Sequence, residues 1–477
     1  MPLQGFHRYA PTGAMALGLA LFSGCQQYVD KPMAPSQTAQ MLLNRSLGSP
    51  ELHEYLKQNL GRDLPEWPLK TWNFETLNWA AFYYNPSLPM ARAQWAQARG
   101  GILTGAERPN PSITLTPGYD FNPAAGTISP WLPAVTVDFP IETAGKRDKR
   151  VKQQEWLAES ARLNVFDAAW QVRGDLRQAL IAWDAAQRKA AVEREQVALA
   201  QRILDLLQQR LDAGAIAADE MSPARLNLVK AQSDAGDAER AQSQARVKIA
   251  QVIGIPASAM DGIDFSLEDL MPGKTLSTTD IATARSVSLQ TRADVLAAMA
   301  NYQASQAALQ LEIAKQYPDI HLGSGYQYDL GENKWSFSVG VDLPVFNHNE
   351  GQIAEAEAAR EQAAAQVLAV QAKIIADIDA AAAASASADA LVADLGKIGA
   401  EMQKHLDLLN AQIDAGAADQ IDKLSGQFDS GANQLALIDA QAQATAARGQ
   451  LEDAFQVPLA NLQSVLNTAV SQPSTPK

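Results

Sequence analysis

Two stretches of the chain alternate between apolar and polar residues with a period of two. In residues 319–343, Ile320, Leu322 and Tyr326 alternate with small or polar residues, and the alternation resumes at Trp335 after a polar turn. Residues 112–139 show a looser version of this pattern around a turn rich in Asn, Pro and Gly. A period of two is the signature of a strand with two unlike faces. The pattern therefore predicts two β-hairpins, each with one apolar and one polar face.

Most of the remaining chain has helical periodicity. Residues 142–212 contain no proline, and Leu176, Leu180 and Leu204 fall at helical spacings. A helix of roughly 70 residues is about 105 Å long, far longer than the ~30 Å hydrocarbon core of a membrane. Further helices are predicted over 50–60, over 72–106 with breaks at Pro86 and Pro89, over 222–253 with Ser222 as N-cap, and over 280–316, 351–413 and 419–455.

The hairpins and the helices that follow them occur twice. The run at 134–141 reappears at 339–345, and the turn Arg210–Ala215 (RLDAGA) reappears as Gln412–Ala417 (QIDAGA). Gly214 is predicted to end the first long helix as a left-handed cap, and Gly416 copies this break in the second. Such self-similarity indicates one structural unit used twice. The predicted fold class is mainly α with a small β part and an internal tandem repeat. The predicted domains are a signal peptide over 1–24, an N-terminal segment over 25–70, a first repeat over 71–253, a linker over 254–279, a second repeat over 280–457 and a C-terminal tail over 458–477.

The beginning of the chain is typical of an export signal. His7 and Arg8 precede an apolar run that ends at Phe22, and two small residues then precede Cys25. This arrangement resembles a bacterial lipobox, with Phe22 at the position where leucine is usual. Cys25 is therefore the predicted lipidation site, and acyl chains there would anchor the mature chain in a membrane. The alternative is an ordinary signal peptide with an incidental cysteine.

Composition narrows the possible functions. The net charge of −14 argues against nucleic acid as a partner, and a single cysteine excludes a disulfide framework. Beyond residue 25 no apolar run approaches the ~18–20 residues of a membrane-spanning helix, so strands would have to cross. Two hairpins cannot close a barrel, and open sheet edges are costly in lipid because unpaired backbone groups there cost several kcal/mol each. Several copies would therefore share one barrel. The alternative for the hairpins is a soluble β-sandwich.

On these features the chain resembles the TolC-like outer-membrane efflux family. The resemblance rests on the duplicated helix–hairpin–helix plan, on the two tip sequences and on the run Pro140–Arg147 (PIETAGKR). That run, together with Trp67-Pro68 and Asn85-Pro86, is most similar to the heavy-metal branch of the family. The resemblance implies a homotrimer with a twelve-stranded β-barrel in the outer membrane and a long α-helical barrel in the periplasm. It also implies docking to a periplasmic adaptor protein and to an inner-membrane pump, of the RND type in the metal branch.

Residues that could carry chemistry are sparse. The five histidines are scattered without metal-ligand spacing, and no thiolate site is possible beyond Cys25. The sequence contains no HExxH, no P-loop, no nucleophile elbow and no dinucleotide-binding turn. His321 falls on the polar strand face and is expected to line a wet lumen. We therefore expect no enzyme activity, no cofactor and no metal site.

The acidic residues at the helix turns are the candidate functional site. In the family the second-repeat tip lines the periplasmic aperture, so the resemblance implies a gate at Asp414, Asp419 and Asp422. We hypothesise that their carboxylates form rings that narrow the entrance and favour cations. The predicted adaptor contacts are Arg210, Asp212, Gly214, Ala215, Gln412, Gly416 and Ala417. The alternative is that these residues only cap and solvate the helix ends, which we prefer for Asp212, Asp219 and Glu220.

The leading functional hypothesis is a passive exit duct of a tripartite efflux system, with metal cations among the possible substrates. A duct for type I protein secretion would share this architecture. A periplasmic coiled-coil structural lipoprotein without a pore is the alternative from a different class. The sequence names neither the cargo nor the particular pump, because a wide duct need not recognise what it conducts.

Overall fold

The computed structural model describes residues 27–64, 66–126, 128–270, 276–329 and 331–458. Contacts divide the chain into two units, Met1–Arg45 and Ser46–Lys477. The predicted signal peptide, Cys25 and nearly all of the predicted tail lie outside the described residues. The first unit contains helix α2 (Pro35–Leu43), which was not predicted. None of its residues is buried.

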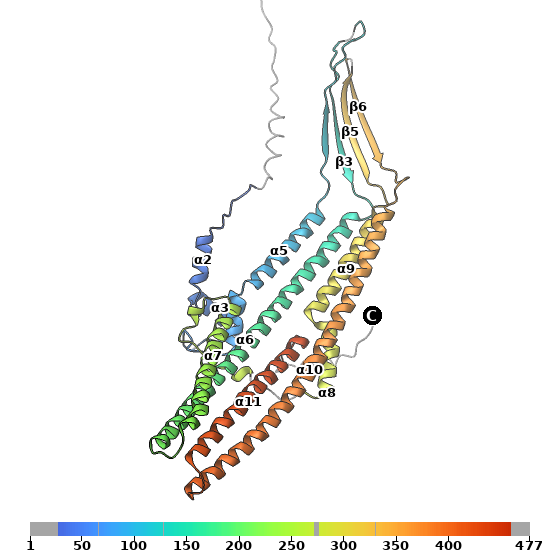
Figure 1. The fold of residues 1–477 in the computed structure, drawn as a ribbon. Coiled ribbons are helices and arrows are strands. Elements are labelled where there is room, and N and C mark those ends of the chain that lie inside the picture. Colours follow the sequence, from blue (N-terminus) through green and yellow to red (C-terminus); the bar gives the residue numbers. More distant parts are fainter. Residues whose placement is uncertain (1–26, 65, 127, 271–275, 330, 459–477) are drawn as a thin grey trace, which may run out of the picture. The chain divides into compact units, whose positions relative to one another are not determined.

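The second unit contains both repeats (Figure 1). The helices of its first half are α3 (Pro50–Leu60), α4 (Phe74–Tyr84), α5 (Ser87–Ala106), α6 (Lys146–Asp212) and α7 (Met221–Ile253). Those of its second half are α8 (Thr278–Thr291), α9 (Ala293–Ala314), α10 (Glu350–Asp414) and α11 (Gln420–Phe455). In each half a long helix pairs with a shorter one to form a helical hairpin, α6 with α7 and α10 with α11. The duplicated plan is confirmed.

Three details of the predicted helices are wrong, each for a local reason. Pro89 does not break a helix, because it lies in the first turn of α5, where no intrahelical N–H bond is required of it. Ser222 is not an N-cap, because the 3-10 turn η1 (Ala218–Glu220) leads directly into α7 at Met221. The helix predicted over 280–316 is interrupted at Arg292, whose extended backbone separates α8 from α9. The predicted break at Pro86 is confirmed.

The two hairpins join into one antiparallel sheet. Its strands are β2 (Ser112–Thr116), β3 (Ala134–Ile141), β5 (Ile320–Asp329) and β6 (Glu332–Val341), in the order β2-β3-β5-β6. Strand β3 of the first repeat pairs with β5 of the second, with Val137 opposite Ser324 and Ile141 opposite Ile320. The first hairpin is shorter than predicted, and beyond it a single bridge joins Tyr119 to Trp131. Strands β2 and β6 are the two edges of this sheet.

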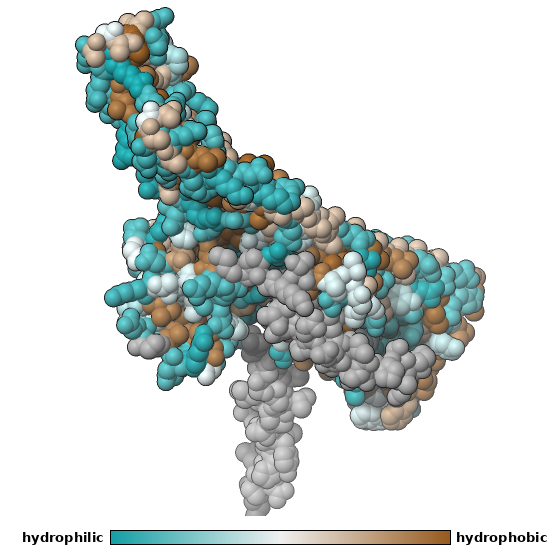
Figure 2. All heavy atoms as spheres, turned by 90° about the horizontal axis from the view of Figure 1, so that it is seen from below, coloured by the Kyte–Doolittle hydropathy of each residue, from teal (hydrophilic) through white to brown (hydrophobic). Residues whose placement is uncertain are grey.

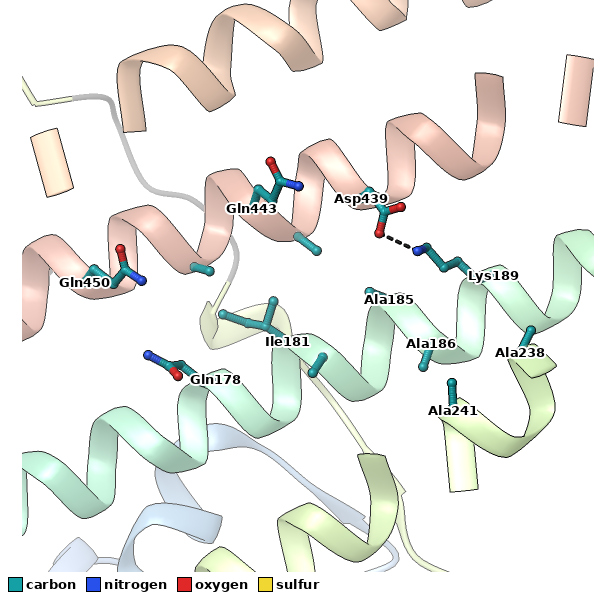
Figure 3. Close-up of a pocket in the computed structure, with 13 residues that line it drawn as sticks. Gln178, Ile181, Ala185, Ala186, Lys189, Ala238, Ala241, Asp439, Gln443 and Gln450 are labelled. Carbon is teal, nitrogen blue, oxygen red and sulfur yellow. Dashed lines mark ion pairs between the residues drawn. The ribbon is translucent and has the colours of Figure 1, made fainter. Parts of the chain in front are cut away.

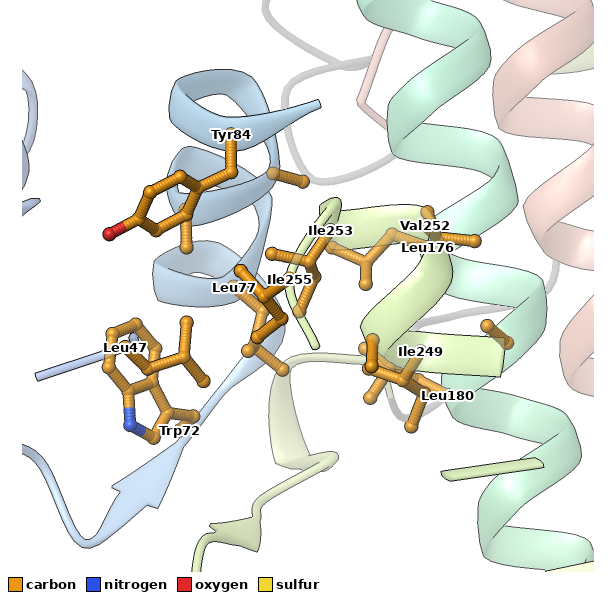
Figure 4. Packing of buried hydrophobic residues seen from close by; sticks show 14 of the residues in the cluster. Leu47, Trp72, Leu77, Tyr84, Leu176, Leu180, Ile249, Val252, Ile253 and Ile255 are labelled. Atoms are coloured by element: carbon orange, nitrogen blue, oxygen red, sulfur yellow. The ribbon is translucent and has the colours of Figure 1, made fainter. Parts of the chain in front are cut away.

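The main apolar core lies where α3, α4, α6 and α7 meet (Figure 4). Trp72, Leu77, Leu180 and Ile253 point toward one another there and are fully buried. Burying each such side chain contributes roughly 1.5–3 kcal/mol. The predicted linker contributes to this core, since its strand β4 (Asp264–Phe265) pairs in parallel with β1 (Thr71–Trp72). Residues 254–270 of the predicted linker are therefore folded against the first repeat.

A charge network around one buried arginine connects the two repeats. Arg177 of α6 is 3% exposed. Its Nη1 lies 3.1 Å from Oδ1 of Asp453 on α11 and also donates to the carbonyl of Gly449. Burial raises the pKa of the Asp453 carboxyl. Arg173, one turn earlier, forms an ion pair of 2.5 Å with Glu452. These bonds fix the first long helix, α6, against α11.

Candidate functional site

The two helical hairpins end in the same turn. Gly214 and Gly416 both have a φ of 71°, in the left-handed region where glycine has no side-chain clash. The amide of Ala215 donates to the carbonyl of Arg210, and that of Ala417 donates to the carbonyl of Gln412, both at 2.8 Å. Each turn is therefore a complete Schellman motif, which satisfies the last carbonyls of the long helix. The sequence prediction of left-handed caps at these glycines is confirmed.

The acidic residues of the second tip have different environments. Asp419 is the N-cap of α11: its carboxylate accepts from the amide of Ile421 at 3.3 Å. Asp422 completes the capping box, since its Oδ2 accepts from the amide of Asp419 at 3.0 Å. Asp414 is the last residue of α10 and is exposed. Asp419 and Asp422 therefore cap the start of α11, whereas Asp414 is exposed to solvent at the end of α10.

An ion pair connects the two tips. Arg210, near the end of α6, donates to the Asp419 carboxylate at the start of α11. The guanidinium lowers the pKa of Asp419, so this carboxylate is ionised and already has a counter-charge. In the described part of the chain, Asp414 and Asp422 take part in no ion pair. Sequence reasoning named both partners but missed the contact, because they are 209 residues apart.

At the first tip the acids remain local. Asp212 accepts a hydrogen bond from Gln208 at 2.8 Å, and Glu220 accepts from the amide of Ala217 at 3.0 Å. Asp212, Gly214 and Ala215 are exposed, as are Gln412, Gly416 and Ala417 at the other tip. Both turns can therefore be reached by a partner from solvent. Figure 2 shows hydrophilic and apolar side chains interspersed over the face of the molecule that it presents.

A shallow groove lies along the helical hairpins (Figure 3). It has a volume of about 460 Å³ and is formed by α6, α7 and α11. Ala185, Ala186, Ala238 and similar small side chains make up most of its wall, and Lys189 pairs with Asp439 at 2.5 Å at one side. This wall carries no arrangement of a nucleophile and a base. Across the described residues there is also no group of three or more His, Cys, Asp or Glu side chains that could hold a metal ion.

The sheet has two chemically different faces. Trp335, Phe337 and Val339 of β6 point to one face, and Phe337 is 86% exposed. The opposite face is built from small and polar residues, and there the Nδ1 atom of His321 lies 2.9 Å from Asp138. Gly323 lies opposite Ser338, whose hydroxyl a Cβ at position 323 would strike. None of the helices in the described ranges is both long and apolar enough to cross a membrane.

Long helical hairpins with a small sheet that exposes one apolar face define a class of outer-membrane proteins. A family model described as outer membrane efflux protein matches residues 81–255 and 284–455. The chain belongs to this family of Gram-negative outer-membrane proteins. Both matched segments contain one hairpin and one helical hairpin, so the match follows the internal repeat.

Three characterised proteins are similar in sequence. The cobalt-zinc-cadmium resistance protein CzcC of Cupriavidus metallidurans is 23% identical over 272 residues, which are 56% of this chain and 62% of CzcC. The nickel-cobalt-cadmium resistance protein NccC of Alcaligenes xylosoxydans xylosoxydans is 24% identical, over 56% of this chain and 61% of NccC. Outer membrane protein OprJ of Pseudomonas aeruginosa is 25% identical, over 56% of this chain and 58% of OprJ. The chain thus aligns with about three-fifths of the length of these relatives.

Solved structures share the fold. A membrane protein from Pseudomonas aeruginosa superimposes with a TM-score of 0.68 at 22% identity, covering 80% of this chain and 90% of that one. CusC, whose structures concern folding and transmembrane channel formation, gives a TM-score of 0.66 at 17% identity, covering 81% and 92%. At these identities the likeness establishes the mainly helical fold with its tandem repeat.

Proposed function

We propose that this protein is the outer-membrane exit duct of a tripartite efflux system. The observation that carries the proposal is the four-stranded sheet, which has one exposed apolar face, one polar face and two edges that pair with no other strand of the described residues. In lipid those edges must pair with other copies, because unpaired backbone groups are costly there. Three copies would supply twelve strands, with the polar faces lining a water-filled lumen. Membership of the efflux family supports this function.

The helical hairpins suit the periplasmic part of such a duct. Helix α6 has 67 residues and α10 has 65, which corresponds to about 100 Å each. Their exposed Schellman turns would contact a periplasmic adaptor protein, and the adaptor would connect the duct to an inner-membrane pump of the RND type. Photo-crosslinkers at Ala215 and Ala417 should then capture the adaptor in cells. A crosslinker at Phe346, which follows β6 at the other end of the helices, should not.

Metal cations are the proposed cargo. Two of the three relatives described above carry metal resistance in their names, whereas the name of OprJ does not specify a cargo. Deleting the gene should sensitise its host to cobalt, zinc or cadmium, and the chain supplied in trans should restore resistance. If the deletion instead abolishes secretion of a protein substrate and leaves metal resistance unchanged, the duct serves type I secretion.

Conductance tests whether there is a pore at all. The full-length protein, extracted from membranes in detergent, should have the mass of three chains and should open channels in planar bilayers. A monomer that remains in water without detergent and opens no channel would make it a structural lipoprotein of the periplasm. Lipidation of Cys25 is tested separately: palmitate labelling should disappear in Cys25→Ser.

We propose further that Asp414 and Asp422 form the carboxylate rings of the periplasmic gate. Asp419 contributes less, because Arg210 neutralises it and keeps the two tips together. Like charges 4 Å apart repel by about 1 kcal/mol in water and about 4 kcal/mol at an effective dielectric of 20. Replacing Asp414 and Asp422 together with asparagine should raise the channel conductance and weaken its preference for cations. The matched control is Asp212→Asn at the other tip; if all variants behave like wild type, these acids do not form the gate.

A further inference from the structure

The apolar face of the sheet ends in a notch beside the helices. This notch has a volume of about 550 Å³ and is formed by Thr143, Ala144, Tyr317, Pro318, Ile320 and Val341. Ile320 and Val341 lie directly opposite each other in the β5–β6 pair. Val341 is on the same face as Phe337, because alternate residues of a strand share a face. The notch is therefore continuous with the exposed apolar face.

Large apolar side chains surround this end of the sheet. Leu343, Val345 and Phe346 follow β6 directly and are 72%, 63% and 100% exposed. Tyr317, on the wall of the notch, is 59% exposed. Contiguous exposed apolar surface of this kind marks a site of interaction. Aromatic side chains are enriched where a membrane meets water, so this rim has the composition of a membrane interface.

A cation without a counter-charge lies at the edge of the notch. The Nζ atom of Lys149 donates to the carbonyl of Ala144 at 2.8 Å, and Ala144 is part of the wall. The nearby carboxylates already form ion pairs with other residues: Asp319 lies 2.7 Å from Lys146, and Glu142 lies 2.6 Å from Arg150. Within the described ranges, no carboxylate lies within ion-pair distance of Lys149. An ammonium group has three N–H donors, so two remain for a ligand.

We infer that the notch binds an anionic phospholipid of the leaflet nearer the helices. One acyl chain occupies the apolar notch, and the phosphate lies against Lys149. The inference rests on the proposed function, because it requires the apolar face to lie in lipid. A second copy of the chain is a poorer occupant. Copies would join through the backbone edges of β2 and β6, whereas the notch opens on the apolar face of the sheet, between the loop after β3, the segment before β5 and the end of β6.

Native mass spectrometry of the full-length protein in detergent tests this inference. The probes are phosphatidylglycerol and phosphatidylethanolamine with identical acyl chains. One bound phosphatidylglycerol per chain is expected, with a preference of about fivefold over the zwitterionic lipid, as one lysine near an anionic surface supplies. Lys149→Gln should remove the preference, since glutamine can still donate to Ala144 but carries no charge. Lys149→Arg should restore it.

Lys334→Gln is the matched control, because it removes the same charge near the start of β6, at the opposite end of that strand from the notch. It should bind phosphatidylglycerol as wild type does. Equal binding of the two lipids by wild type, or an unchanged preference in Lys149→Gln, overturns the inference. If Lys149→Gln changes the mass of the oligomer in the absence of bound lipid, the inference is also overturned, because the notch would then bind a second copy of the chain. Flotation of Cys25→Ser with liposomes separates the two levels, because this variant has no acyl anchor. If it floats while wild type shows no lipid preference, only the lipid site is refuted; if it does not float, the proposed function is refuted.

Discussion

Replacing the buried arginine that joins the repeats should destabilise the protein more than any surface substitution. Arg177→Met keeps most of the side-chain volume and removes the guanidinium that pairs with Asp453 and donates to Gly449. Glu452 keeps Arg173 as a partner at 2.5 Å. Asp453 has no other ion pair among the described residues, and its side chain is 31% exposed, so water compensates its charge only in part. Breaking a fully buried pair costs about 3–5 kcal/mol, and the partial exposure of Asp453 places this substitution at the lower end, about 3 kcal/mol.

The free-energy cost of Arg177→Met corresponds to a shift in the melting temperature. Unfolding entropy is about 2.1 cal/mol/K per residue, so for the second unit, Ser46–Lys477, about 1 kcal/mol shifts the midpoint by about 1 °C. Arg177→Met should therefore melt about 3 °C below wild type at pH 7. The loss should shrink in acid, because burial raises the pKa of Asp453 and a protonated carboxyl needs no cation. Because this carboxyl pKa is higher in the folded than in the unfolded protein, protonation of Asp453 stabilises the folded state. The melting-temperature loss should therefore be smallest below ~3.9, the ordinary pKa of Asp, and should return as pH rises through the pKa of Asp453 in the folded protein.

A double-mutant cycle isolates the pair. Asp453→Asn alone leaves Arg177 with the Gly449 carbonyl and the nearby Glu452 carboxylate, so it should cost only about 1–2 kcal/mol. In the Arg177→Met background, Asp453→Asn should recover part of the loss, with a coupling of about 1–3 kcal/mol. The assay is intrinsic tryptophan fluorescence of the detergent-solubilised protein during heating at one fixed rate. If Arg177→Met melts within 1 °C of wild type, or if the two losses simply add, the network does not stabilise the junction between the repeats.

Three further outcomes are expected. Gly431→Ala should lower the melting temperature, because its new Cβ would strike the Gln196 amide, and Gln196→Ala in the same chain should restore it; failure of this rescue would contradict the packing. Phe337→Arg should prevent recovery of the protein from the outer-membrane fraction, because an arginine facing lipid near the bilayer centre costs about 2–4 kcal/mol. Ser338→Arg, on the opposite face of the sheet, should be recovered as wild type is. Equal recovery of the two variants would mean that neither face meets lipid. The distance between spin labels at Ala215 and Ala417 should be the same at pH 7 and pH 5 and should increase only in more acidic solution, because Arg210 lowers the pKa of Asp419 and the ion pair between the tips is lost only as pH falls through that lower value. Asp419→Asn should show the larger distance at every pH, and an acid step in that variant would assign the titration to another group.

Local patterns in the sequence determined the elements of this fold. The alternation in residues 319–343 predicted β5 and β6, because alternate side chains of a strand meet different environments. Gly214 and Gly416 predicted the ends of the long helices, since a left-handed residue stops a helix with little strain in glycine. The errors at Pro89 and Ser222 were also local, because proline and serine are tolerated inside a first turn as well as before it.

Only the tertiary structure decided which elements meet. The β3–β5 pair, the contact of Arg177 with Asp453 and the ion pair of Arg210 with Asp419 each join residues far apart in the chain. Such pairs leave no periodic signal, because their energy depends on where the backbone brings them and not on their neighbours in sequence. The same holds for the notch beside Lys149, whose wall comes from the segments after β3, before β5 and at the end of β6. The sequence thus determined a repeated unit of hairpin and helices, and the packing of one copy against the other produced the sheet, the joined tips and the notch.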